Sequence, residues 1–111
     1  MAFSFHGVAG TTVANKTANQ TQAVFTFAPG LDITTLAILC VAVDNNATTD
    51  IDEGAVTAVS DSKGNTWIKL QERTNGQGSA QAGATISIWY SVLTTAIASG
   101  DTATADRKSV V

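Results

Sequence analysis

VSDSKGNTWI, residues 59–68, places a charged, glycine-containing turn directly before a tryptophan. The carboxylate of Asp61 can accept backbone N–H groups within such a turn. Gly64 or Asn65 can adopt the positive φ that a tight turn needs. Trp67 then begins an extended segment and can enter the core at once, which fixes the register of the pairing. We therefore predict a β-hairpin that is stabilised jointly by the polar turn and by the tryptophan that follows it.

Extended patterns like those beside this turn recur along the 111-residue chain, whereas signals for helices are sparse. Short runs rich in Val, Ile, Thr and aromatic residues, separated by Gly, Asn and Asp, are typical of strands. The predicted strand segments are 3–8, 11–17, 23–27, 35–44, 55–61, 65–73, 84–93 and 102–105. This spacing predicts a single all-β domain over 1–111. It would be an antiparallel two-sheet sandwich of about seven or eight strands, immunoglobulin-like or jelly-roll-like.

Two of these segments make distinct predictions about burial. Segment 35–44 is apolar on both faces, so we expect a central strand covered on both sides. Its Cys40 is the only cysteine and is interpreted as a small buried hydrophobe. In segment 84–93, Trp89 and Tyr90 point to opposite faces, and the strong alternation around Trp67 and Trp89 favours core positions for both.

The composition excludes several classes of function. Hydrophobic residues make up 44 % of the chain, charged residues only 14 %, and the net charge is −3. A weakly charged, Thr-rich surface suits a protein that packs against other protein. Arg107 and Lys108 form the only basic cluster, so nucleic-acid binding is not expected. No apolar run approaches the roughly 20 residues of a membrane span, and the first ten residues do not resemble a signal peptide. We expect synthesis in a host cytoplasm.

An acidic segment, residues 44–53, is the one candidate for a metal site. Its oxygen ligands would be those of Asp44, Asp50, Asp52 and Glu53, which suit Ca²⁺. The spacing does not match an EF-hand loop, and a solvated acidic loop explains the run equally well. We expect no cofactor.

Candidate sites for catalysis and for sugar binding are weak. A hydrolase would need His6, the only histidine, beside a serine or a carboxylate, and no G-x-S-x-G motif occurs. We therefore expect no enzymatic activity. Trp67, Trp89 and Tyr90 could stack on sugar rings if they were exposed.

The hairpin motif resembles a recurring β-sandwich module of bacteriophage virion proteins and bacterial surface proteins. That module has a D-x-x-G-N-x-W turn, matched here by Asp61, Gly64, Asn65 and Trp67. A later strand of the module carries an aromatic pair followed by a loop with a glycine, matched by Trp89-Tyr90 and Gly100. The resemblance spans roughly residues 33–105.

The resemblance implies a non-enzymatic structural component of a tailed-bacteriophage virion. The small stand-alone length suits a capsid decoration (cement) protein. It would act through protein–protein contacts with the major capsid protein, with copies of itself, or with both. An alternative is a carbohydrate-binding or adhesin module of a tail fibre or a bacterial surface protein.

The two ends of the chain are candidate subunit contacts. Phe3 and Phe5 lie on one face of the first segment, and the chain finishes in Val110 and Val111. The resembling modules continue with a further strand at that point. Apolar side chains at strand edges favour pairing with another chain, so we expect an oligomeric or assembly-bound protein located in the virion.

Overall fold

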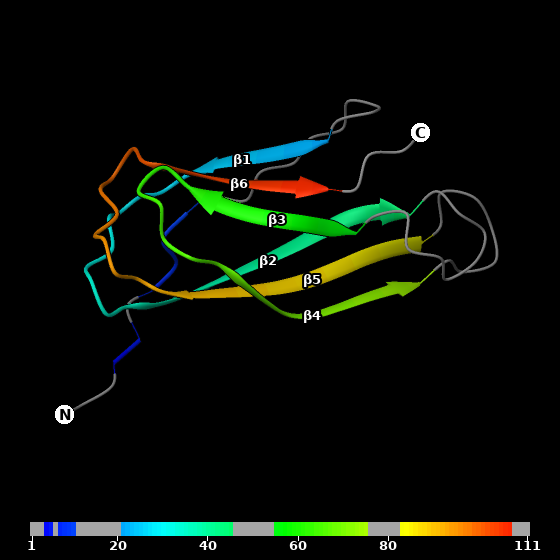
Figure 1. Cartoon of the computed structure of the whole chain (residues 1–111), viewed down its shortest axis with the longest axis horizontal. Coiled ribbons are helices and arrows are strands. Elements are labelled where there is room, and N and C mark those ends of the chain that lie inside the picture. Colours follow the sequence, from blue (N-terminus) through cyan, green and yellow to red (C-terminus); the bar gives the residue numbers. More distant parts are fainter. Residues whose placement is uncertain (1–3, 6, 11–20, 46–54, 76–82, 108–111) are drawn as a thin grey trace.

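The chain folds into two antiparallel β-sheets, with no helix in the described residues (Figure 1). The computed structural model describes residues 4–5, 7–10, 21–45, 55–75 and 83–107. Six strands occur there: β1 Gln22–Thr26, β2 Leu36–Asn45, β3 Val56–Asp61, β4 Ile68–Asn75, β5 Gly83–Val92 and β6 Thr102–Arg107. The all-β prediction is therefore confirmed.

Each sheet has three strands, in the orders β1-β6-β3 and β2-β5-β4. The chain crosses between the sheets after β1, β2, β3 and β5, and only β4 and β5 are consecutive strands of the same sheet. Every strand pair is antiparallel. This two-layer arrangement is consistent with a β-sandwich.

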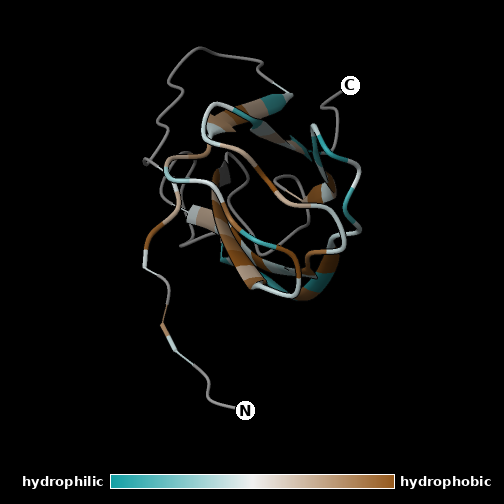
Figure 2. Cartoon of the chain, turned by 90° about the vertical axis from the view of Figure 1, so that its left-hand side faces the viewer, coloured by the Kyte–Doolittle hydropathy of each residue, from teal (hydrophilic) through white to brown (hydrophobic). Residues whose placement is uncertain are grey.

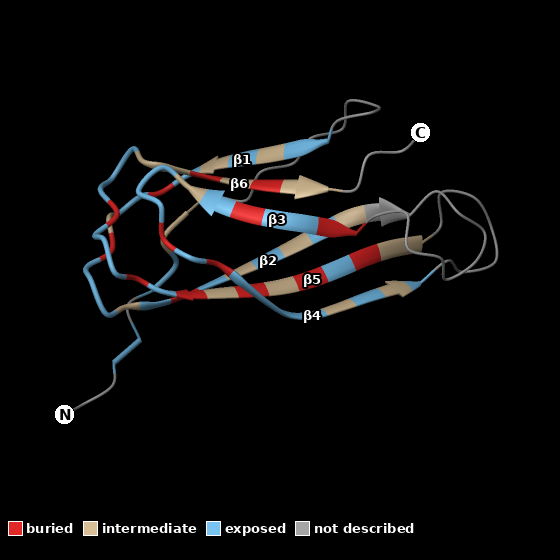
Figure 3. Ribbon diagram, in the orientation of Figure 1, coloured by how far each residue is buried: buried red, intermediate tan, exposed pale blue. Residues whose placement is uncertain are grey.

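Buried residues lie on strands of both sheets and in the connections at one end of the molecule (Figure 3). Phe25 and Phe27 lie on one side of β1 and its extension, with ring centroids 5.0 Å apart. Their common direction follows from the alternation in segment 23–27. The buried core cluster consists of Phe27, Leu31, Ala37, Val56, Val59, Trp67, Trp89, Leu93, Ile97, Ala103 and Ala105.

The two long sides of the sandwich differ. On one side, the 61–67 turn carries the chain from β3 to β4 in the other sheet, so the predicted β-hairpin does not form. The Val56 N–H of β3 donates to Glu72 Oε2 of β4 at 2.9 Å. On the other side lie β1 and β2, the edge strands of their sheets, and a groove of about 930 Å³ lies between them. The sandwich is therefore closed along one side and open along the other.

The number of strands is smaller than the seven or eight expected. The described part of segment 3–8 contains no strand. Gly10, just beyond this segment, forms an isolated bridge to Phe27. Segment 11–17 lies outside the described residues.

The prediction that 35–44 forms a central strand is wrong, because among the described strands β2 pairs only with β5 and lies at the edge of its sheet. Cys40 is exposed rather than buried. An apolar pattern on both faces therefore does not distinguish a central strand from an edge strand whose outward side chains are exposed in the single chain.

A bulge changes the faces expected for β4. The register shifts between Lys69 and Gln71. Over this interval β4 advances by two residues while β5 advances by one. Glu72 therefore lies on the same side as Lys69, and the two side chains form an ion pair at 3.2 Å. Simple alternation along a regular strand would place them on opposite faces. A second bulge lies in β3, between Val56 and Ala58.

Candidate functional site

The turn at 61–67 is organised by the carboxylate of Asp61. Its Oδ1 accepts the backbone N–H of Lys63 at 2.8 Å and that of Asn65 at 3.3 Å. Its Oδ2 accepts the indole N–H of Trp67 at 2.7 Å. Gly64 has a φ of +77°, which a glycine adopts without steric cost. One carboxylate thus holds both the turn and the tryptophan that follows it.

Asn65 links this turn to the segment that follows β5. Its Oδ1 accepts the backbone N–H groups of Thr94 and Thr95, both at 2.9 Å, and its Nδ2 donates to the Thr95 carbonyl at 3.0 Å. The residue is buried. The sequence pattern had offered Asn65 only as a turn residue with positive φ, and Gly64 takes that conformation instead. The link to Thr94 and Thr95 was missed because nothing in the local sequence indicates it.

The side chains of Asp61, Asn65 and Trp67 make their hydrogen bonds within the protein, so the turn stabilises the fold. Trp67 and Trp89 both lie in the core. The indole N–H of Trp89 donates to Ser87 Oγ at 3.1 Å, and the Lys69 ammonium lies 5.3 Å from the centroid of the Trp89 ring. Neither tryptophan offers an open face for a sugar ring. Tyr90 is half-buried on the opposite face of β5.

The acidic candidates are only partly described. Asp44 lies near the end of β2, whereas Asp50, Asp52 and Glu53 lie outside the described residues. Within the described ranges, no three His, Cys, Asp or Glu side chains gather as they would around a metal ion. In the same residues no helix has the length and apolar character needed to cross a membrane.

The most unusual feature of the described surface is the polarity of β5. Its inward side chains include three small polar ones that are almost fully buried, namely Thr85, Ser87 and Ser91. Its outward side chains are apolar or aromatic, and Ile86 and Val92 are 53 % and 56 % exposed. A solvated sheet face normally shows the reverse pattern.

The neighbouring strands extend this apolar surface. In β2, Leu36 lies beside Val92 and Ile38 beside Tyr90, and in β4, Ile68 lies on the other side of Tyr90. Of the ten large apolar side chains that are exposed among the described residues, six belong to this one sheet. We call the apolar outward side chains of β2, β5 and β4 the apolar outer face. They are Leu36, Ile38, Cys40, Ala42, Ile68, Ile86, Ile88, Tyr90 and Val92.

Hydropathy along the strands agrees with this description. Figure 2 shows hydrophobic segments on the strands of the β2-β5-β4 sheet, in the lower half of the view. After the bulge the outward side chains of β4 are polar, beginning with Gln71 beside Ile88. Arg73, which lies beside Ile86 in the register, marks one border.

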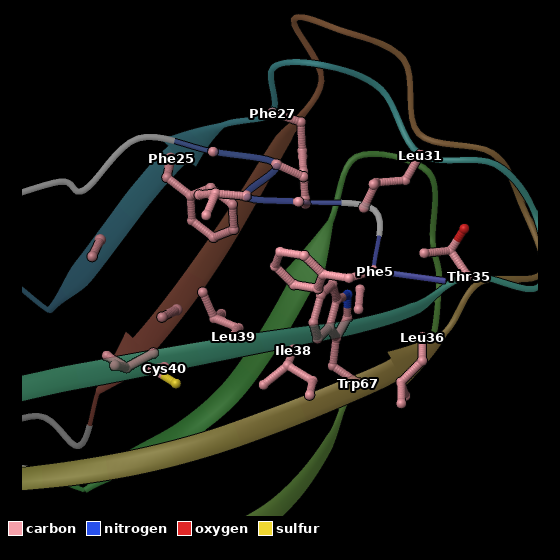
Figure 4. A pocket seen from close by; sticks show the side chains of 18 of the residues that line it. Phe5, Phe25, Phe27, Leu31, Thr35, Leu36, Ile38, Leu39, Cys40 and Trp67 are labelled. Carbon is pink, nitrogen blue, oxygen red and sulfur yellow. The ribbon is translucent and has the colours of Figure 1, made fainter. Parts of the chain in front are cut away.

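The groove between β1 and β2 lies next to this face (Figure 4). Phe25, Leu39 and Trp67 contribute apolar side chains to its wall, and the backbone of residues 7–10 borders it. Phe5 also lines the groove, yet 90 % of it is exposed. Of the terminal residues expected at subunit contacts, Phe3, Val110 and Val111 lie outside the described residues.

Comparisons with known proteins leave the chain without an assigned family. No family model matches it, and neither a curated protein nor a solved structure shows significant similarity to it.

Proposed function

We propose that this protein is a non-enzymatic structural component of a tailed-bacteriophage virion, and more specifically a small decoration protein that binds the capsid shell. The observation that carries the proposal is the polarity of β5, which buries Ser and Thr and exposes Ile and Val. Burying apolar area stabilises a protein by about 25 cal/mol per Å². A chain that leaves its aliphatic side chains outside gains this stabilisation only when another protein covers them.

The chemistry of the apolar outer face supports a protein partner. Contiguous exposed apolar surface on a small domain marks an interaction site, and β-branched and aromatic side chains dominate this one. The face has no cluster of lysine or arginine, so a polyanionic partner is not favoured. A broad, largely apolar sheet surface, with Arg73 at its β4 border, fits an equally apolar, relatively flat protein surface, as on an assembled shell.

The resemblance of the 61–67 turn to modules of virion proteins supports the same role. The finer fold that goes with it is an immunoglobulin-like or jelly-roll-like sandwich. The hydrogen bonds of Asp61 and Asn65 give that motif a physical purpose, because they hold the 61–67 turn and the segment after β5 together. A rigid frame of this kind suits a protein whose task is to present a surface.

Mass spectrometry of purified phage particles tests the proposal directly. We expect the chain at a fixed stoichiometry relative to the major shell protein. Its absence from particles, or its presence only in traces, would contradict a decoration role.

An add-back assay locates the contact. Purified protein is mixed with particles that lack it, and bound protein is measured after sedimentation. Ile86→Lys should reduce binding at least about tenfold, because a buried charge without a partner is costly. Ser60→Lys is the matched control, since Ser60 is exposed on the other sheet. Equal binding by both variants would place the contact elsewhere.

The alternative role, a carbohydrate-binding or adhesin module, has a distinct signature. Trp67 and Trp89 are buried, so Tyr90 is the aromatic side chain that a sugar could reach on the apolar outer face. Polysaccharide binding that disappears in Tyr90→Ala, together with unchanged particle binding, would favour the adhesin.

A further inference from the structure

The four edge strands of the two sheets differ in how they are protected against pairing with another chain. β1 has only five residues, which limits what it can pair with. β3 and β4 each contain a bulge, and β4 also carries Lys69, Glu72 and Arg73. Short length, bulges and charges are the usual devices that prevent edge-to-edge association.

β2 has none of these devices. It is ten residues long, and its register with β5 continues without a shift from Leu36 to Asn45. From Leu36 to Val43 it contains no charge, no proline and no glycine. Ile38 is 64 % exposed and Cys40 is also exposed. Among the strands that the structure describes, β2 is therefore the long, regular template for another strand.

The backbone groups on the open side of β2 follow from the pairing on its other side. The Leu93 N–H donates to the Thr35 carbonyl at 3.0 Å. Because antiparallel pairs alternate between hydrogen-bonded and non-hydrogen-bonded, the odd-numbered residues after Thr35 exchange their bonds with β5. Leu36, Ile38, Cys40 and Ala42 consequently direct their N–H and C=O groups away from the sheet.

We infer that β2 pairs with β2 of a second copy of this chain, in antiparallel orientation about a two-fold axis perpendicular to the sheet. This operation keeps both outer faces on the same side. A parallel arrangement would turn one sheet over and place the apolar outer face of one copy beside the inner face of the other. The antiparallel pair forms one six-stranded sheet, β4-β5-β2-β2-β5-β4, with a continuous apolar surface. The inference does not rest on the proposed virion role.

The register of the pair is fixed by two conditions. Residues that face each other must lie on the same side of the sheet, so even-numbered residues oppose even-numbered ones. If the whole strand Leu36–Asn45 overlaps with its copy, the residue at the two-fold axis is Cys40 or Val41. If only the uncharged part, Leu36 to Val43, overlaps, the residue at the axis is Leu39 or Cys40. Only a centre at Cys40 satisfies both, and it places Cys40 opposite Cys40 of the second copy.

This register predicts a specific cross-link. Directly opposed residues of a hydrogen-bonded antiparallel pair have Cα atoms about 5.5 Å apart, within the range of a disulfide. Diamide accepts the two electrons and two protons that the two thiols lose when the disulfide forms. We expect the wild-type chain to become a covalent dimer with this reagent, at protein concentrations where the non-covalent dimer is present.

A double variant, Cys40→Ser with Ala42→Cys, controls for random collisions. Its thiol lies on the same strand and the same face, two residues further on. In the inferred register the two copies of residue 42 are offset by four residues, which is about 13 Å along the strand. Diamide should cross-link this variant at least about tenfold more slowly, because a disulfide cannot span that distance. Equal rates for the two proteins would overturn the register.

Sedimentation velocity tests the dimer itself. At about 100 µM, where a dimer with a micromolar Kd is well populated, we expect a species of twice the 11.4 kDa chain mass. Ala42→Pro should give the monomer, because it removes an N–H that points to the second copy and not to β5. Cys40→Lys should also give the monomer, because it places two like charges opposite each other. This variant keeps the backbone N–H groups, so it tests the dimer even if Ala42→Pro does not fold.

Ile86→Lys is the matched control for the mode of association. It adds the same charge to the same face, but on β5 rather than on the edge strand. We expect it to remain dimeric while it loses binding to particles. A wild-type monomer, a dimer that survives Cys40→Lys, or a monomer produced by Ile86→Lys would overturn pairing through β2. Failure of the virion proposal would instead leave the dimer intact and the particles without the chain.

Discussion

Asp61 stabilises the 61–67 turn, which connects the two sheets, through both of its carboxylate oxygens. Oδ1 accepts the backbone N–H groups of the turn, whereas Oδ2 accepts the indole N–H of Trp67. The indole therefore contributes buried apolar area and a hydrogen bond to an ionised group, which is stronger than one between neutral partners. The two contributions can be separated by substitution.

Trp67→Ala should lower the free energy of unfolding by about 3–5 kcal/mol, because it removes a large core side chain. Trp67→Phe should cost less, about 1.5–3 kcal/mol, since it keeps most of the apolar area but leaves Asp61 Oδ2 without this donor. Urea unfolding followed by circular dichroism measures both variants. An unchanged midpoint for Trp67→Ala would show that the indole is not a core residue.

Ser91 presents the opposite situation, a buried hydroxyl without a visible partner. Its Oγ has no hydrogen bond in the structure, although the residue is only 1 % exposed. Ser91→Ala should therefore raise the free energy of unfolding by about 1 kcal/mol. Ser87→Ala is the matched control and should lower it, because Ser87 Oγ accepts the Trp89 indole N–H. A loss of stability in Ser91→Ala would indicate that its hydroxyl has a partner, such as an ordered water.

At the scale of elements, the two crossing connections at one end of the sandwich hold each other. Leu31, in the connection between β1 and β2, exchanges both backbone hydrogen bonds with Ile97, in the connection between β5 and β6, at 2.7 and 2.9 Å. Gly30 lies directly beside this pair. A Cβ at Gly30 would lie 2.5 Å from the Ile97 carbonyl oxygen, so the close approach of the two connections requires glycine.

Gly30→Ala should accordingly destabilise the protein by about 3 kcal/mol, because backbone atoms would have to move apart. Gly64→Ala tests a different cause. It has open space around it, and only its positive φ resists a side chain, which costs about 1–2 kcal/mol. Thermal or urea unfolding of the two variants should rank them in this order. The reverse order would mean that the two connections separate easily.

The elements also show where sequence reasoning succeeds and where it fails. The turn at 61–67 was predictable because its chemistry is local: a side-chain acceptor, a glycine and a large apolar residue lie within seven positions. The edge position of β2 was not predictable, because its apolar residues satisfy the pattern of a central strand equally well. The bulge at Leu70 reverses the faces of β4 after it, and no residue there is diagnostic of a bulge. The contacts of Asn65 with Thr94 and Thr95 depend on tertiary structure.

At the scale of the whole molecule, apolar residues are divided between the core and the apolar outer face. The interior layer of β5 is filled partly by Thr and Ser, while aliphatic side chains of the same strand lie in water. Such a distribution gives the isolated domain less stabilisation than its 44 % hydrophobic composition would allow. Under the proposed role, the remaining stabilisation would come from covering the apolar outer face with another protein.

This division predicts that the apolar outer face can be made polar without loss of the fold. Ile86→Lys should change the free energy of unfolding by less than about 0.5 kcal/mol, because Ile86 makes few buried contacts. It should also reduce the fluorescence of a bound apolar dye such as anilinonaphthalene sulfonate. Thr85→Lys, one position earlier, should unfold the protein, because Thr85 is fully buried and its hydroxyl lies 2.9 Å from that of Thr74. Strong destabilisation by Ile86→Lys would mean that the side chain belongs to the core of the single chain, and the outer face would then not be an interface.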